Sequence, residues 1–527
     1  MKLKCCSLKY MFAWTVLAAL LLAGVLFFML WGVSKIINSQ IKSQSQLENN
    51  TDQWNRFIEI PFPISFGVRF FNVTNPDEVR NNNTKPRLTE TELYVYNMHI
   101  NKYNIRQDSS EEDSITYQRN LTFEYDESSK GKKTDNVTII NPVLLAALQI
   151  TDGIERLAFA GCLKQLFQPD LTDNIFITAS VDNILFEGLN FAFANDSKLG
   201  VACTIVRTKV LTIAENLRNI EHVDNGDGND YLRFSIFNYK RSGYKKENPD
   251  GIYTINRGRS NIEELGNIIR WNSKPKIDKW GTRYSINNDS CNRVNGSDST
   301  IYRPFLNDYE DLYIYSTDIC RSVKLEYKNS DARYNGIQAF RYEAPSTVFR
   351  SSTPNPENDC FCTKSTKDAQ GNENCYLDGV FDFKPCIGSP IVASMPHYLN
   401  ADQKYLDNFE DLKPNETLHG IYLLLEPNTG TPLQARKRIQ LNSILHKVPL
   451  LTSITPDNMF ETVFPFLWLE ESVDLPQEYV DLLNNQLFSK VTLANGIADG
   501  LVAVASVLFV IILFFLIRKL LLRNRTQ

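Results

Sequence analysis

Two long apolar segments, one near each end of the chain, constrain what this sequence can fold into. Residues 11–33 hold no charged side chain, and as a helix they span about 34 Å, against roughly 30 Å of bilayer hydrocarbon. A second apolar run, residues 501–517, lies within a predicted membrane helix over 497–517. The chain is therefore predicted to cross a membrane twice and to form one large domain from residues 34–496.

Basic residues beside these segments predict their orientation. Three lysines precede the first segment and four basic residues follow the second: Lys2, Lys4, Lys9, Arg518, Lys519, Arg523 and Arg525. Positively charged flanks stay on the cytoplasmic side of a membrane. We therefore expect cytoplasmic tails at 1–10 and 518–527, with the large domain on the extracellular or lumenal side.

A cleaved signal peptide is the alternative for the first segment, because Gly32-Val33-Ser34 has the small residues of a cleavage site. The apolar core of a signal peptide is about 7–15 residues long. The run at 11–33 is longer, which favours an uncleaved anchor.

Charge is unevenly distributed along the chain. The formal net charge is −5, and each end, taken with its apolar segment, carries +3, so the large domain carries −11. An acidic domain does not attract nucleic acid or anionic lipoprotein through its overall field. Any anion binding therefore needs a local cationic patch. No linker or repeat interrupts the domain, which is long enough to bury a single core.

Two features place the large domain in an oxidising, glycosylating compartment. Asn-x-Ser/Thr sequons occur only in this domain, at Asn49, Asn72, Asn82, Asn120, Asn136, Asn195, Asn288, Asn295 and Asn415. Eight of the ten cysteines also lie there, an even number, as a disulfide framework requires. Cys5 and Cys6 lie in the predicted cytoplasmic tail, where S-palmitoylation and two unmodified thiols are both open.

The body of the large domain is predicted to be mainly antiparallel sheet. Residues 93–100 are rich in β-formers, and 115–125 alternate apolar with polar residues. This pattern predicts a hairpin or meander across the polar stretch 106–114. Similar runs follow at 231–237, 312–315 and 421–425.

Helix signals cluster in residues 141–168. Asn141-Pro142 places a capping residue before a proline at the first helical position. Asp152 and Glu155 form a box-like cap for a second helix, which Pro169 ends.

The second helix has apolar residues on both sides. One face carries Ile154, Leu157, Ala158 and Gly161, at the spacing expected for packing on neighbours. The other face carries rings and cations that are candidates for ligand binding: Arg156, Phe159, Leu163, Lys164 and Phe167. A helix buried on all sides and a ligand-binding surface both fit this pattern.

Six cysteines gather in one region: Cys291, Cys320, Cys360, Cys362, Cys375 and Cys386. The last four have spacing that could bind zinc in a cytosolic protein. In an oxidising compartment disulfides are favoured, but six cysteines allow fifteen pairings and spacing alone does not choose between them.

The sequence resembles the class B scavenger receptors, a family that includes platelet glycoprotein four (fatty acid translocase), the high-density-lipoprotein receptor, the lysosomal integral membrane protein type two and insect sensory neuron membrane proteins. The resemblance runs nearly end to end. It rests on FFNVTNPDEV (70–79), DGIYTINRG (250–258), SCNRVNGSDS (290–299), STDICRSV (316–323), PENDCFCT (356–363), SMPHYL (394–399), EPNTGTPLQARKRIQLN (426–442) and FPFLWLEE (464–471).

This resemblance implies a particular fold. The large domain is expected to be an irregular antiparallel β-barrel with a helical bundle at about 141–190, at the end far from the membrane, and a hydrophobic tunnel inside. The implied disulfides are Cys291–Cys360, Cys320–Cys386 and Cys362–Cys375. The cations that face the ligand are expected near Arg156 and Lys164.

The sequence departs from the family pattern at several points. Glu92-Leu93 replaces the usual Gly-Pro before a strand, and the region around 186–189 lacks the usual Gly-Tyr-x-Asp-Pro. Cys162 and Cys203 are additional to the six-cysteine framework, and a fourth disulfide between them fits the even count. The tail RNRTQ lacks an acidic-dileucine sorting signal, which favours the plasma membrane over a lysosomal or endosomal membrane.

Enzyme motifs are missing from the sequence: there is no Gly-x-Ser-x-Gly, His-Glu-x-x-His, Walker or Gly-x-Gly-x-x-Gly pattern. His397 is interpreted as a structural histidine, and residues 224–230 as an acidic turn because their spacing is not that of an EF-hand. We expect no cofactor and no metal.

Two functions remain. One is a receptor that accepts lipids or lipoprotein-like and anionic particles and conducts lipid through the tunnel to the membrane. The other is a recognition or trafficking receptor for a protein or cell surface. Homo-oligomerisation stays open in both.

Overall fold

The computed structural model describes residues 8–107, 113–150, 153–167, 175–192, 194, 198–224, 230–241, 250–281, 290–352, 354–367, 373–448 and 451–525. Within it the chain divides into two compact units. The terminal unit is Met1–Gln46 with Leu475–Gln527, and the large unit is Leu47–Asp474.

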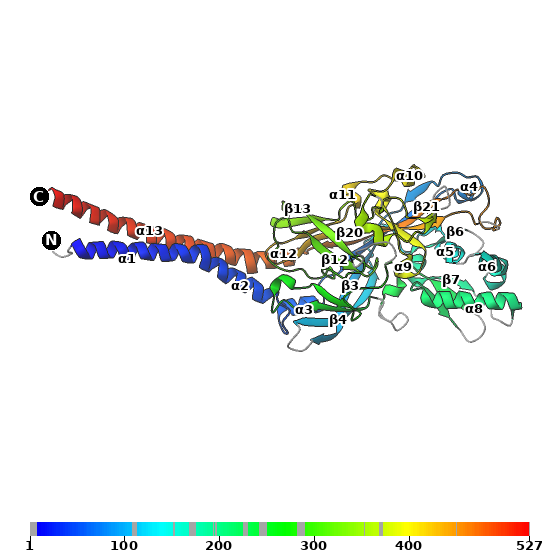
Figure 1. The fold of residues 1–527 in the computed structure, drawn as a ribbon, viewed down its shortest axis with the longest axis horizontal. Coiled ribbons are helices and arrows are strands. Elements are labelled where there is room, and N and C mark those ends of the chain that lie inside the picture. The colour runs from blue at the N-terminus through cyan, green and yellow to red at the C-terminus, as the bar shows by residue number, and fades with distance from the viewer. Residues whose placement is uncertain are drawn as a thin grey trace. The chain divides into compact units, whose positions relative to one another are not determined.

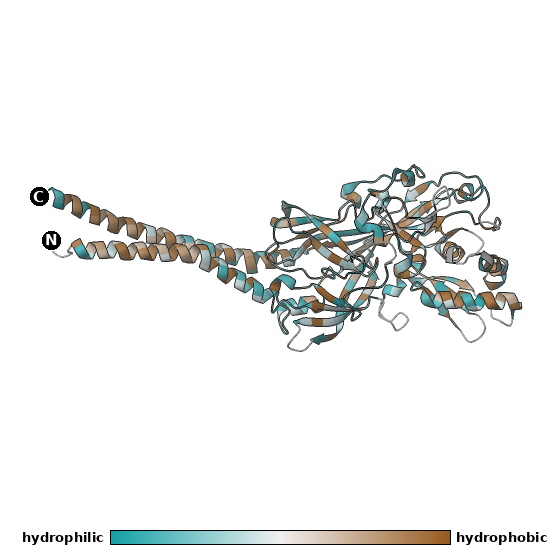
Figure 2. Ribbon diagram, in the orientation of Figure 1, coloured by the Kyte–Doolittle hydropathy of each residue, from teal (hydrophilic) through white to brown (hydrophobic). Residues whose placement is uncertain are grey.

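The terminal unit is made of helices from both ends of the chain, and α1 packs against α13 (Figure 1). At the N-terminal end α1 (Leu8–Phe27), the π-helical turn η1 (Phe28–Val33) and α2 (Ser34–Ser45) follow one another without a break, as do α12 (Gln477–Leu483), η9 (Asn484–Phe488) and α13 (Ser489–Asn524) at the other end. Both helices are long and apolar enough to cross a membrane. Figure 2 shows the apolar residues along α1 and α13.

The helices extend beyond the predicted spans 11–33 and 497–517, which lie inside them. The helical residues beside the apolar runs, 34–45 and 484–496, are mostly polar but contain no proline. Since proline is the residue that most strongly stops a helix, the helices continue into the polar sequence.

A 14-stranded antiparallel sheet forms the body of the large unit. Its path runs β11-β10-β4-β3-β1-β21-β20-β19-β14-β13-β12, with β2, β17 and β18 attached beside it. The strands are β1 (Ile64–Val73), β2 (Leu88–Glu90), β3 (Tyr94–Gln107), β4 (Ser114–Tyr125), β10 (Ile252–Asn256), β11 (Ile268–Trp271), β12 (Leu312–Ser316), β13 (Arg321–Tyr334), β14 (Ile337–Glu343), β17 (Val380–Asp382), β18 (Ile391–Ser394), β19 (Tyr422–Leu425), β20 (Pro432–Leu445) and β21 (Thr462–Asp474). The predicted hairpin is confirmed, because β3 pairs with β4.

The expected barrel is not closed. The sheet ends at β11 and β12, and among the described residues no ladder joins these two strands. A short irregular segment lies between them instead: Ile268 N donates to Gly296 O (2.8 Å) and Ser297 N donates to Tyr313 O (3.0 Å). Gly296 has φ +82°, and a Cβ there would lie 1.9 Å from Tyr313 O. Only glycine allows the chain to pass this close to the edge of the sheet.

Smaller sheets and helices complete the large unit. β5 (Asn136–Ile140) pairs with β6 (Phe176–Ser180), β9 (Tyr231–Phe234) lies between β7 (Leu189–Ala192) and β8 (Ile220–Val223), and β15 (Thr366–Lys367) pairs with β16 (Glu373–Asn374). The helices are α3 (Asp52–Ile58), α4 (Pro76–Asn81), α5 (Pro142–Ile150), α6 (Gly153–Leu166), α8 (Val201–Asn216), α9 (Lys384–Ile387), α10 (Gln403–Leu406) and α11 (Glu416–His419), with short 3-10 or π turns η2 (Asn183–Glu187), η4 (Asn238–Lys240), η6 (Ile262–Glu264), η7 (Pro356–Phe361) and η8 (Pro396–Tyr398).

The helical region differs from the bundle expected at 141–190. Helices α5 and α6 form where the caps predicted them, and Asn141 Oδ1 accepts from Leu144 N (3.1 Å). The proposed caps Asp152 and Pro169 lie outside the described residues. Beyond α6 the chain turns to strands β6 and β7, because the β-branched sequence of β6 pairs with β5, and the third helix, α8, comes only at Val201–Asn216.

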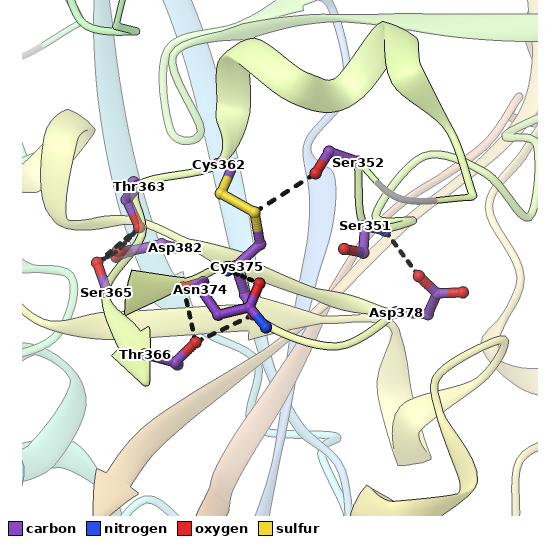
Figure 3. The surroundings of a disulfide bond; sticks show 10 residues. All are labelled: Ser351, Ser352, Cys362, Thr363, Ser365, Thr366, Asn374, Cys375, Asp378 and Asp382. Atoms are coloured by element: carbon purple, nitrogen blue, oxygen red, sulfur yellow. Dashed lines mark hydrogen bonds between the residues drawn. A yellow bond between two sulfur atoms is a disulfide. The ribbon is translucent and has the colours of Figure 1, made fainter. Parts of the chain in front are cut away.

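Four disulfides cross-link the large unit. They join Cys291 to Cys360, Cys320 to Cys386, Cys362 to Cys375 and Cys162 to Cys203. These are the three pairs that the resemblance implied and the additional fourth pair. Figure 3 shows the Cys362–Cys375 bridge, where Ser352 Oγ lies 3.4 Å from Cys375 Sγ.

Candidate functional site

Helix α6, the predicted ligand-binding helix, buries the face that was expected to meet ligand. Phe159, Leu163 and Phe167 are 3%, 2% and 9% exposed and belong to the hydrophobic core. The opposite face is accessible instead: Leu157 and Gly161 are exposed. Of the two alternatives that the sequence left open for this face, the structure has the buried one for these three side chains, which pack in the core of the large unit.

The two predicted cations lie outside this core. Lys164 is exposed and Arg156 is half-buried. Burial of His446 is the main cause that lowers the pKa of that histidine, and the positive charge of Arg156 lowers it further. Helix α6 is tied to α8 by the Cys162–Cys203 bridge and by an ion pair between Glu155 and Lys209. On α8, Val201 and Ile205 are 83% and 66% exposed. The accessible part of this region is therefore a mixed surface of aliphatic and charged residues, without the rings.

A second candidate site is an apolar pocket inside the large unit, with a volume of about 110 Å³. Its walls come from residues 218–219 and 236–240 and from β12, β13, α9, β18, β20 and β21. Most of the lining is aliphatic or aromatic: Ile236, Phe237, Ile314, Ile319, Val323, Val348, Phe349, Phe383, Ile387, Ile391, Ile421, Ile439, Leu441 and Leu469. An apolar cavity of roughly 150 Å³ holds benzene, so this smaller pocket has room for only a few carbons of an apolar chain. The expected tunnel is not shown by the described residues.

Charged residues on the pocket wall are paired with one another. Lys240 Nζ lies 2.6 Å from Asp318, and Lys437 Nζ lies 2.9 Å from Glu471 and 3.6 Å from Asp318. Burial acts to raise the pKa of Asp318, but the two lysines outweigh it and hold that pKa well below its usual range. Burial likewise acts to lower the pKa of Lys240, and the carboxylates raise it above its ordinary value. This group is therefore a fixed, charged network at neutral pH.

Two polar groups of the lining have no partner. The hydroxyl of Ser316, a residue only 8% exposed, makes no hydrogen bond within the described parts of the chain. Arg218 is half-buried and, among the described residues, makes no ion pair or hydrogen bond, whereas Arg438, the other lining arginine, lies 2.5 Å from Glu470. The charge of Arg218 acts on Tyr239, which lines the same pocket and whose pKa is raised mainly by burial.

The sequence did not reveal this pocket. Its lining is drawn from positions between 218 and 471, and no local motif marks residues that only the fold brings together. Only individual lining residues fall in segments that the sequence marked. Ser316 is the first residue of the family-like segment STDICRSV, and Lys437 and Arg438 lie in the segment EPNTGTPLQARKRIQLN.

His397 is a structural histidine, as interpreted from sequence. Its backbone N donates to Gln440 Oε1 (2.7 Å), its Nδ1 accepts from Lys413 N (3.1 Å) and its Nε2 contacts Glu90. Among the described residues no cluster of three or more His, Cys, Asp or Glu side chains could hold a metal ion. Most of the acidic turn at 224–230, like Cys5 and Cys6, lies outside those residues.

Most sequons are accessible. Asn49, Asn82, Asn136 and Asn415 are exposed, and Asn72, Asn120 and Asn295 are half-buried. The side-chain oxygen of Asn120, on β4, is buried without a partner among the described residues. Asn195 and Asn288 lie outside the described residues.

Taken together, these features define a membrane protein with an apolar helix at each end and a large, disulfide-linked, β-rich domain that encloses an apolar pocket. Residues 15–516 match the CD36 family. The chain is 32% identical over 459 residues to sensory neuron membrane protein 2 of Heliothis virescens, covering 85% of this chain and 82% of that protein. It is 31% identical to sensory neuron membrane protein 2 of Manduca sexta, with 90% of each chain covered, and 31% identical to sensory neuron membrane protein 1 of Apis mellifera, with 85% and 80% covered. The chain belongs to the CD36 family, the class B scavenger receptors.

Proposed function

We propose that this protein is a cell-surface receptor, without catalytic activity, that binds lipids or other amphiphiles in its large domain and conducts them to the plasma membrane. In this proposal both short tails lie in the cytoplasm and the large domain lies outside. The basic flanks of the terminal helices and the restriction of sequons to the large domain support that topology.

One observation carries the proposal: the apolar pocket of about 110 Å³ in the large unit. Protein interiors are close-packed, and a pocket with mostly apolar walls and a few polar groups is typical of a small-ligand site. An acyl or alkyl chain gains free energy by leaving water for such walls, about 0.8 kcal/mol per buried CH₂ group. A chain of a few carbons therefore has a sufficient driving force to enter.

A route for conduction is supported by a second, very small pocket of about 10 Å³. Val348, Phe349 and Ile421 line both pockets. Phe349 therefore belongs to the wall that the two pockets share. Phe349→Ala should speed transfer of a fluorescent fatty acid from a donor vesicle into cells that express the receptor, and an unchanged rate would remove this route.

Lipid analysis of the full-length receptor tests the binding itself. The receptor is purified into nanodiscs of one deuterated phospholipid, so that any undeuterated lipid found by mass spectrometry arrived with the protein. Ile439→Trp fills the pocket and should abolish the co-purifying lipid. Ile444→Trp, on the same strand but outside the lining, is the matched control and should retain it. Equal amounts of co-purifying lipid from both variants would refute binding in this pocket.

Recognition of a particle or protein is the second candidate, and the exposed aliphatic residues on α6 and α8 favour it. Leu157, Val201 and Ile205 are 43%, 83% and 66% exposed, and large apolar side chains in such positions are typical of contact surfaces. Arg156 and Lys164 on α6 would supply attraction for anionic particles that the acidic domain otherwise lacks. The charge-reversal experiment in the Discussion tests this role.

A further inference from the structure

Tyr309 is an unusual residue on the surface of the large unit. Its side chain is 87% exposed, more than that of any other tyrosine of this unit that the structure describes. Its backbone φ is +66°, a conformation that residues of this size rarely adopt. Because the ring lies mostly in water, burial of the ring does not offset the cost of that conformation, and such outliers suggest a function. Among the described residues, no hydrogen bond engages the hydroxyl of Tyr309, which is therefore free to react.

Acidic residues flank Tyr309 in the sequence and remain accessible in the fold. Asp308 precedes it, and Glu310 and Asp311 follow it. Asp308 is exposed and makes no ion pair with the residues that the structure describes. The side chains of Glu310 and Asp311 each pair with a neighbouring cation but are still 43% and 33% exposed. An approaching protein therefore meets a phenol among three carboxylates that it can reach.

The loop that carries Tyr309 is anchored on both sides. Before it, Leu306 N donates to Pro427 O (2.8 Å). After it, Tyr327 N donates to Asp311 Oδ1 (3.0 Å), and the ring of Tyr327 lies 5.4 Å from the ring of Tyr309, measured between centroids. The exposed phenol therefore projects from a fixed base on the folded domain.

Tyr125 has an equally acidic sequence context but a different environment. Residues 124–127 read Glu-Tyr-Asp-Glu, so the sequence alone would select Tyr125 as readily as Tyr309. In the structure Tyr125 is half-buried, and its hydroxyl donates to Gly131 O (2.5 Å). A reagent that attacks through this hydroxyl would first have to break that hydrogen bond. The structure therefore separates the two tyrosines and leaves Tyr309 as the reactive one.

We propose that Tyr309 is sulfated on its phenolic oxygen by a lumenal tyrosine sulfotransferase while the receptor passes through the secretory pathway. The flanking carboxylates would direct the basic site of such an enzyme to this tyrosine. The phenolic oxygen attacks the sulfur of a nucleotide phosphosulfate donor, so that a new O–S bond forms and the bond from sulfur to the bridging oxygen breaks. The phosphate leaves with that electron pair, and a base of the transferase takes the phenolic proton. The inference goes beyond lipid binding and rests on the proposed function only for the lumenal position of the large domain.

The test labels the full-length receptor with radioactive sulfate in cultured eukaryotic cells. N-glycans are removed enzymatically before counting, because glycans can also carry sulfate, and alkaline hydrolysis should then release labelled sulfotyrosine. Tyr309→Phe should lose most of this label, since phenylalanine has no hydroxyl to accept the sulfate. Its delivery to the cell surface should be normal, because the side chain is exposed.

Three further variants show whether the local environment selects Tyr309. Asp308→Asn removes a charge but keeps an oxygen that can accept from the Tyr327 hydroxyl, as Asp308 Oδ1 does at 3.0 Å, so the label should fall severalfold without loss of folding. Tyr313→Phe, in the same part of the chain and 42% exposed, is the matched control and should keep the label. Tyr125→Phe should also keep it.

Failure of this inference can be told apart from failure of the proposed function. Sulfotyrosine that persists in Tyr309→Phe, or that disappears in Tyr125→Phe or Tyr313→Phe, would place the modification elsewhere and overturn the assignment. A surface receptor that carries N-glycans but yields no sulfotyrosine would also overturn it, while leaving the proposed topology and lipid binding intact. A receptor without N-glycans would show that the large domain does not enter the lumen, so the topology of the proposed function would fail and this inference with it.

Discussion

Acidification is expected to loosen the segment 413–418, because the imidazole of His419 holds it through a nitrogen lone pair that protonation occupies. His397 Nδ1 accepts from Lys413 N and His419 Nδ1 accepts from Asn415 N, each at 3.1 Å. The two imidazole rings stack with centroids 4.3 Å apart and planes 5° apart. A protonated imidazole carries hydrogen on both nitrogens and cannot accept a hydrogen bond. Two charged groups affect the pKa of His419: Glu90 raises it and Arg438 lowers it. Arg69 in turn lowers the pKa of Glu90.

The size of the expected loss of stability follows from the lowered pKa of His419. Burial, with the neighbouring His397, lowers the pKa of His419 to about 4, against about 6.5 for an unperturbed histidine. Between pH 4 and 6.5, the state in which segment 413–418 has detached therefore binds more protons than the hydrogen-bonded state. The hydrogen-bonded state is accordingly most stable above pH 6.5 and loses stability as the pH falls toward 4. At pH 5 the full shift corresponds to about 2 kcal/mol, and since screening by solvent reduces it, we expect about 1 kcal/mol.

Hydrogen exchange measures this directly on the full-length receptor. After correction for intrinsic rates, peptides covering 411–420 should exchange about fivefold faster at pH 5 than at pH 7. His419→Asn keeps an acceptor near the Asn415 amide but cannot titrate, so its exchange should depend less on pH, while His99→Asn on β3 should behave like the unmodified protein. Equal corrected rates at both pH values would refute the reasoning.

Three further predictions concern the cross-links, the topology and α6. Cys320→Ser should lower surface expression, because loss of a native disulfide from an extracellular domain typically costs about 2–5 kcal/mol; peptide mapping without reduction should recover the Cys320–Cys386 link, and free thiols at both positions would contradict it. Protease added to intact cells should digest the large domain and spare tags at both ends, and a tag that antibodies reach on unpermeabilised cells would overturn the topology. Arg156→Glu with Lys164→Glu should weaken binding of anionic phospholipid vesicles and its salt dependence, by roughly 1 kcal/mol per contact at these accessible positions, with normal surface delivery. Unchanged vesicle binding by that double variant would exclude this helix as the anionic surface.

Local patterns in the sequence predicted what local forces decide. Two uncharged apolar runs determine the terminal helices, because a helix that satisfies its own backbone hydrogen bonds is the form such a segment takes in a membrane. Alternation over 115–125 predicted β4 and its hairpin with β3, and Asn141-Pro142 predicted the start of α5, because capping and side-chain period act over a few residues. The family-like segments around the cysteines implied three of the pairs that the structure forms.

Tertiary structure alone decided which face of α6 is buried, whether the sheet closes, and where the pocket lies. Both faces of α6 carry apolar residues, so its periodicity could not choose, and the core took Phe159 and Leu163 because burying larger side chains removes more apolar surface from water. The sheet stays open, and the segment at Gly296 lies between its two edge strands; the need for glycine there is visible only when β12 is placed beside it. Arg218 and Ser316 are 98 positions apart in the sequence; they line one pocket because the fold brings distant segments together, and a charge without a partner can be recognised only when all of its neighbours are known.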